Sequence, residues 1–131
     1  MGKFLLAPLL LLLAACGGGV PGTADFDLTI ADRALVGSRT TFVADQGDQI
    51  TFTITADEQG ELHLHGYDLR RDVGPDAPTT FTFKVDATGR FAIELHIDAA
   101  EDGHDTDAAD DHGHGDTGAD ILLGALEVRP R

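Results

Sequence analysis

The sequence of 131 residues carries 23 Asp and Glu against 9 Lys and Arg, a formal net charge of −14, and it contains one cysteine. A body this acidic repels nucleic acid and anionic membrane surfaces, which excludes nucleic acid as a partner. Cations are the natural small partners of such a chain, although acidity alone also serves to keep an exported protein soluble.

The first fifteen residues are typical of a targeting segment. Lys3 supplies a positive charge, and residues 4–15 form an apolar run of the length of a secretory signal, too short to span a bilayer. Residues 13–16, Leu-Ala-Ala-Cys, resemble the bacterial lipobox, in which a signal peptidase cuts before a cysteine that carries diacylglycerol. We therefore predict a lipoprotein signal peptide over residues 1–15 and lipidation of Cys16; the alternative is a buried apolar segment with a chance cysteine.

Lipidation at Cys16 uses the only thiol, so no disulfide is expected. The lipidated cysteine and the glycine-rich stretch after it, residues 16–24, are predicted to be a flexible tether that holds the protein to a membrane. The remaining residues 25–131 suffice for one domain with a modest core. The sequence thus predicts an exported protein on the periplasmic or cell-surface side of a membrane.

The domain is predicted to consist of short strands separated by turns. Apolar residues alternate with polar ones, the pattern of a half-buried strand, over residues 26–30, 39–43, 50–55, 61–67, 80–85, 91–95 and 121–128. Residues 45–48, 57–60 and 86–89 have turn composition. Residues 70–78, polar and with two prolines, are expected to cross between sheets without regular structure. About seven strands and no amphipathic helix predict an all-β, antiparallel β-sandwich.

One segment, residues 98–120, departs from this pattern. It has no Lys or Arg, it has almost nothing apolar larger than alanine, and it is rich in Asp, Gly and His. Because it cannot bury enough apolar surface to offset its ordering entropy, we expect a mobile loop. Its histidines, His104, His112 and His114, are weaker candidates for metal ligands.

A better candidate site lies in the strands. His63 and His65 are one residue apart in a predicted strand, so their side chains should share a face while Leu62 and Leu64 point to the core. Two imidazoles on one face can meet at a single metal ion. His96, at the end of the 91–95 strand, should lie on the same polar face as Glu94. We predict a metal site at His63, His65 and His96, with Glu94 as a weaker candidate; the alternative is solvated surface histidines.

Four stretches resemble a cupredoxin-like domain of the exported bacterial type, similar to domains of periplasmic iron-uptake proteins. The most specific is residues 61–68, which contain the run His-x-His-Gly-Tyr-Asp; the others are residues 46–52, 89–96 and 122–128. The resemblance covers residues 26–128. It implies a Greek-key β-sandwich whose metal ligands, where present, lie at one end, with one ligand from the strand of His63 and His65 and others near His96.

The chain departs from this family where a blue-copper site needs a cysteine thiolate and usually a methionine. Cys16 lies at the predicted anchor, the only methionine is Met1, and the expected cysteine position is occupied by the stretch ending in His96. A blue-copper electron carrier is therefore excluded. Imidazole and carboxylate ligands favour copper as Cu²⁺ first and zinc second.

Together these features predict a lipid-anchored, extracytoplasmic metal-binding protein for copper capture, buffering or delivery. No enzyme is expected, because the chain has no Gly-x-Ser-x-Gly elbow and no Gly-rich phosphate loop, and Ser38 is its only serine. The alternative is a metal-free β-sandwich that serves as an interaction or accessory domain of a surface lipoprotein.

Overall fold

The computed structural model describes residues 19–97 and 118–131, and all of its regular elements in these ranges are strands. Nine strands follow in chain order: β1 (Thr23–Ala31), β2 (Ala34–Leu35), β3 (Thr41–Asp45), β4 (Gln49–Ala56), β5 (Gly60–Leu64), β6 (Leu69–Val73), β7 (Thr79–Lys84), β8 (Gly89–Ile97) and β9 (Ala119–Arg129). In this part of the chain no helix is long and apolar enough to cross a membrane.

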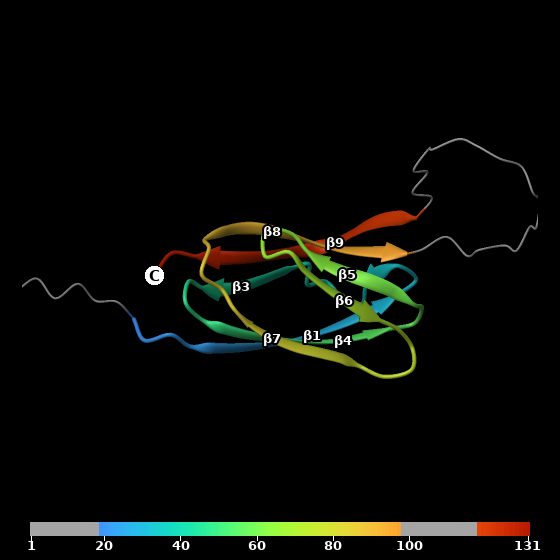
Figure 1. Cartoon of the computed structure of the whole chain (residues 1–131), viewed down its shortest axis with the longest axis horizontal. Helices are drawn as coiled ribbons and strands as arrows, with labels where there is room; N and C mark the ends of the chain where they lie inside the picture. Colours follow the sequence, from blue (N-terminus) through green and yellow to red (C-terminus); the bar gives the residue numbers. More distant parts are fainter. Residues whose placement is uncertain (1–18, 98–117) are drawn as a thin grey trace, which may run out of the picture.

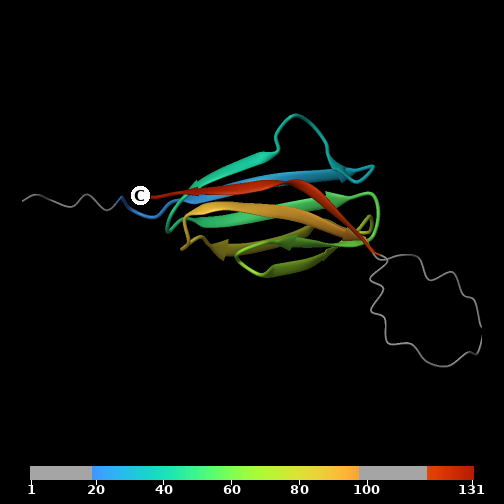
Figure 2. The same ribbon diagram turned by 90° about the horizontal axis from the view of Figure 1, so that it is seen from above.

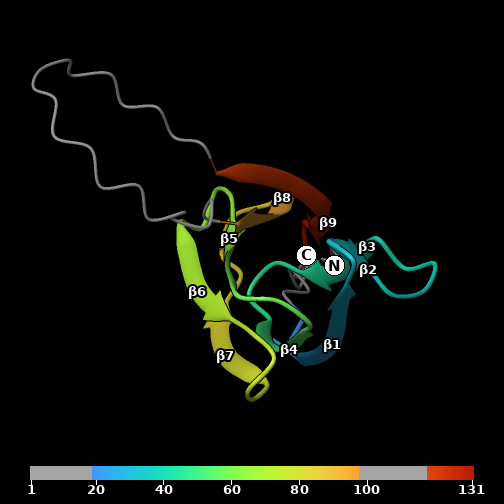
Figure 3. The same cartoon turned by 90° about the vertical axis from the view of Figure 1, so that its right-hand side faces the viewer.

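The strands form two sheets that pack face to face (Figures 1 and 3). One has the order β2-β1-β4-β7 and the other the order β3-β9-β8-β5-β6. The predicted all-β sandwich is therefore confirmed. Both sheets are mixed, however, because β1 pairs with β4 in parallel and β3 pairs with β9 in parallel, whereas the sequence predicted antiparallel strands.

The core lies between the sheets and is built by strand alternation. Phe52 and Ile54 of β4 face Leu62 and Leu64 of β5 from the opposite layer, and all four are at most 1% exposed. Each such burial contributes about 1.5–3 kcal/mol of transfer free energy. The aromatic rings of β1, β3, β4 and β7 contact one another in edge or tilted arrangements around Phe52. The period-two patterns of the sequence thus correspond to the buried face of each strand.

The prediction for residues 70–78 was wrong at its beginning. Residues Leu69–Val73 form β6, an edge strand that pairs antiparallel with β5. Only Val73 of this strand is fully buried, and its three central residues are exposed, so the strand has no apolar alternation to find. β5 itself ends at Leu64 instead of residue 67, because the chain turns there into β6. The strand β2 was not predicted, because two residues are too few to show an alternating pattern.

The two ends of the sandwich are distinct. At one end the first described residues lie beside the C-terminus, where the Arg131 side chain donates to the carbonyl of Val20. At the other end β8 stops and β9 begins (Figure 1), and β9 then runs along the sandwich back to the C-terminus (Figure 2). Ala119 and Asp120, predicted to be loop, already belong to β9. The predicted signal peptide, Cys16, and His104, His112 and His114 lie outside the described residues.

Candidate metal centre

His63 and His65 lie side by side on the outer face of the five-stranded sheet. His63 sits between Leu62 and Leu64, both 0% exposed and turned to the core, so its own side chain is turned outward. His65 follows the end of β5, but its backbone N–H still donates to the carbonyl of Ala92 at 2.9 Å, which continues the pairing with β8. The two imidazole centroids are 4.2 Å apart, with 34° between the rings. The prediction that both histidines share a face is confirmed.

Glu94 completes a cluster with these two rings. In the antiparallel pairing of β5 and β8, Glu94 stands directly opposite His63. Its Oε2 lies 2.5 Å from Nε2 of His65. One ligand atom from each of His63, His65 and Glu94 lies within 4.8 Å of the other two, and all three residues are partly buried. We call these three residues the histidine cluster.

A shift of strand register lies next to Glu94. Ile93 pairs with Gly124 of β9, but Glu94 pairs with Leu122, so Leu123 has no partner of its own on β8. An extra residue of this kind is a β-bulge, which twists the strands locally and changes where nearby side chains point. The sequence gives no signal for the bulge, because it depends on how two separate strands meet.

His96 lies in the same cavity but outside the histidine cluster. The cavity, of about 280 Å³, is lined by both cluster histidines, Glu94, Arg70, His96 and Asp120. His96 Nδ1 is 2.7 Å from Asp120 Oδ1, its cross-strand partner on β9. Sequence reasoning placed Glu94 below His96 as a ligand and did not name Asp120. The structure brings the Glu94 carboxylate within reach of both imidazoles and places His96 two residue pairs further along the sheet, opposite Glu61.

The turn after His65 packs against the aromatic rings of Phe91 and Phe83. Gly66 has φ of 78°, and a Cβ there would collide with the ring of Phe91, so glycine is required. Tyr67 packs edge-on against Phe91 and Phe83, and its hydroxyl donates to the carbonyl of Ala87 at 2.8 Å. Burial raises the pKa of the Tyr67 phenol, which keeps it a neutral donor. These contacts hold His65 where its ring meets His63.

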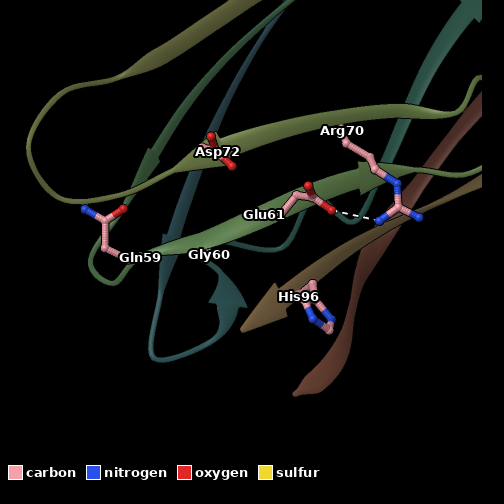
Figure 4. Close-up of a pocket in the computed structure, with 6 residues that line it drawn as sticks. All are labelled: Gln59, Gly60, Glu61, Arg70, Asp72 and His96. Carbon is pink, nitrogen blue, oxygen red and sulfur yellow. Dashed lines mark hydrogen bonds and ion pairs between the residues drawn. The ribbon is translucent and has the colours of Figure 1, made fainter. Parts of the chain in front are cut away.

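A second polar cavity adjoins the first one. It has a volume of about 460 Å³ and is lined by Gln59, Gly60, Glu61, Arg70, Asp72 and His96 (Figure 4). Glu61 and Arg70 form an ion pair across it, with Arg70 Nη1 2.8 Å from Glu61 Oε1. Arg70 and His96 line both cavities, so this ion pair lies at the border of the candidate metal centre.

The donor set of the histidine cluster has a definite chemistry. Two neutral imidazole nitrogens and one carboxylate oxygen suit Cu²⁺ and Zn²⁺, and three protein ligands leave a coordination position open. The described residues include neither cysteine nor methionine, so no soft sulfur ligand is available there. The chemistry of these three groups is therefore suited to a divalent transition metal.

Comparison with known proteins supports the architecture. No protein-family model matches the sequence, and no curated protein sequence does. Among solved structures, the multicopper oxidase mgLAC is similar at 16% identity over 83% of this chain, with a TM-score of 0.57. The blue copper oxidase of Nitrosomonas europaea is similar at 20% identity over 83%, with a TM-score of 0.54. A copper binding protein in its apo form is similar at 6% identity over 80%, with a TM-score of 0.51.

The fold is cupredoxin-like. The resemblance noted in the sequence is thus confirmed for the fold. At these identities the likeness concerns architecture alone. The chain matches 39% of the length of each of the two oxidases and 86% of the copper binding protein, so it corresponds to one part of the larger chains. The resemblance implies metal ligands at one end of the sandwich, whereas the histidine cluster lies on the outer face of the five-stranded sheet.

Proposed function

We propose that this protein is an extracytoplasmic metal-binding module, anchored to a membrane by a lipid on Cys16, that captures copper and hands it on. The observation that carries the proposal is the convergence of His63, His65 and Glu94, whose ligand atoms lie within 4.8 Å of one another. The similarity of the fold to copper oxidases and to a copper binding protein supports copper over zinc. The protein acts as a carrier or buffer and catalyses no reaction.

The geometry favours exchange over permanent storage. The His65 side chain is 45% exposed and that of Glu94 is 28% exposed, so a bound ion remains within reach of a partner's ligands. The open coordination position gives such a partner a place to attack. The acidic chain, with a net charge of −14, raises the local concentration of cations around the site.

Calorimetric titration of the full-length protein in detergent with Cu²⁺ and with Zn²⁺ tests the proposal. We expect a copper site whose affinity falls by more than about a hundredfold in the His63→Ala/His65→Ala variant. A variant with alanine at His104, His112 and His114 is the matched control and should keep this site. Because imidazole must be neutral to bind metal and protons compete for the same nitrogens, affinity should also fall as the solution is made acidic. No heat with either metal would instead favour a metal-free accessory domain.

A further inference from the structure

A positive charge stands next to the histidine cluster. Arg70 of β6 pairs directly with His63 of β5, and its side chain lines the same cavity as His63, His65 and Glu94. A cation is an unexpected neighbour for a site that binds cations. By Coulomb's law it opposes the entry of a metal ion, and it does so in proportion to the charge of that ion.

The position of Arg70 is set by its neighbours. Its guanidinium is bonded to Glu61 on the adjacent strand, as Figure 4 shows, and the Arg70 side chain is 54% exposed. Glu61 therefore offsets part of the positive charge. A further acid, Asp120, lines the cavity and contacts His96, and the exposed Asp68 lies nearby, with its Oδ1 3.7 Å from Nε2 of His63. Of the charged groups that line the cavity, Arg70 is the fixed cation.

We propose that Arg70 is the charge-selectivity residue of this site, which weakens the binding of divalent ions more than that of monovalent ions. The proposal rests on the proposed function, since it concerns the same metal. Repulsion from Arg70 is twice as large for Cu²⁺ as for a monovalent ion at the same place. Cu²⁺ is thus held loosely enough to be passed on, and the site discriminates less against Cu⁺ than the ligands alone would.

Arg71 provides a matched control. It is the next residue of β6 and points to the other side of the strand, with its guanidinium 5.2 Å from the centroid of the Phe81 ring. It has the same charge and lies in the same edge strand, but it does not line the cavity of the histidine cluster. Removing its charge changes the net charge of the protein by the same amount as removing that of Arg70.

The test is competitive titration of the full-length protein with Cu²⁺ and, as a stable monovalent probe, Ag⁺. Arg70→Gln should tighten Cu²⁺ binding about fivefold and Ag⁺ binding about twofold, because the repulsion scales with ionic charge. Arg70→Lys, which keeps the charge, should bind Cu²⁺ within about twofold of the parent protein. Arg71→Gln should leave both affinities unchanged. High salt should shrink the effect of Arg70→Gln, since the side chain is half exposed.

Glu61, the ion-pair partner of Arg70, provides a second test, which separates an effect of charge from a purely structural role of Arg70. Glu61→Gln should weaken Cu²⁺ binding, and the Glu61→Gln/Arg70→Gln double variant should return it towards the parent value. The proposal is overturned if Arg70→Gln leaves Cu²⁺ affinity unchanged or lowers it, or if it tightens Ag⁺ as much as Cu²⁺. A parent protein that binds neither ion would overturn the proposed function as well, so the two failures are distinguishable.

Discussion

The surroundings of Asp48 and the histidine cluster are two polar regions of this molecule with different kinds of contact. Asp48, at the end of the sandwich where the described chain begins and ends, accepts hydrogen bonds from the backbone N–H of Gly22 at 2.6 Å and of Asp45 at 3.1 Å, and it also contacts the Arg131 guanidinium. Only 7% of Asp48 is exposed. In the histidine cluster, by contrast, groups that can all bind a cation face one another.

The difference lies in the kind of atom that contacts each carboxylate, that of Asp48 or that of Glu94. Every contact of Asp48 noted above is with a donor of the protein itself, so its charge is already satisfied within the fold. Glu94 meets an imidazole of His65, which can donate a proton or, when neutral, bind a metal. An acidic side chain is therefore structural where donors of the protein surround it, and it becomes a candidate ligand where other ligands surround it.

The His63→Ala/His65→Ala variant is expected to lose the most metal affinity, and substitution of Glu94 is expected to have the next largest effect. Glu94→Gln keeps the size of the side chain but removes the charge that attracts the ion, so Cu²⁺ affinity should fall about tenfold. Calorimetric titration measures the change. Asp120→Asn is the matched control, because Asp120 contacts His96 and lies outside the histidine cluster. Equal losses in the two variants would show that Glu94 acts only through the general acidity of the face.

A change at Asp48 should affect stability and leave metal affinity unchanged. The hydrogen bonds from Gly22 and Asp45, followed by the charge of Arg131, hold the pKa of Asp48 below its ordinary value, against the opposing effect of burial. The stability that this gives is present above the ordinary aspartate pKa of about 3.9 and is lost as the pH falls through the lowered value.

Thermal unfolding of Asp48→Asn at several pH values tests this. The variant should unfold at a lower temperature than the parent protein at pH 7, and the gap should narrow as the pH falls below about 3.9. Cu²⁺ affinity at neutral pH serves as the control and should be unchanged. A gap that stays constant down to the lowest pH would contradict the role assigned to the ionised carboxylate.

Local pattern predicted the strands of this protein where one face of the strand is buried. Burial alternates along β1 and β4 and through the middle of β8, because each strand lies within a sheet with one side on the core. β6 lies at a sheet edge and buries little, so its sequence resembles a loop. The parallel pairs of β1 with β4 and β3 with β9 were not predictable from local pattern, which carries no information on the direction of a distant partner.

The candidate site, like the fold, was predictable only where it depends on the pattern within one strand. The spacing of His63 and His65 lies within one strand, so their shared face followed from strand geometry alone. The choice of a third ligand depends on the register between β5 and β8, which sets Glu94 opposite His63 and places His96 opposite Glu61. That register, the bulge at Leu123 and the position of Arg70 are properties of assembled strands, which explains why sequence reasoning ranked His96 above Glu94.

Electron paramagnetic resonance of the full-length protein with half an equivalent of Cu²⁺ tests the central claim most directly, since only the tightest site is then filled. The spectrum should show nitrogen splitting from two imidazoles, and this splitting should disappear in the His63→Ala/His65→Ala variant. A copper signal without nitrogen splitting, or one that the double substitution leaves unchanged, would contradict the assignment of His63 and His65 as the residues that hold the ion.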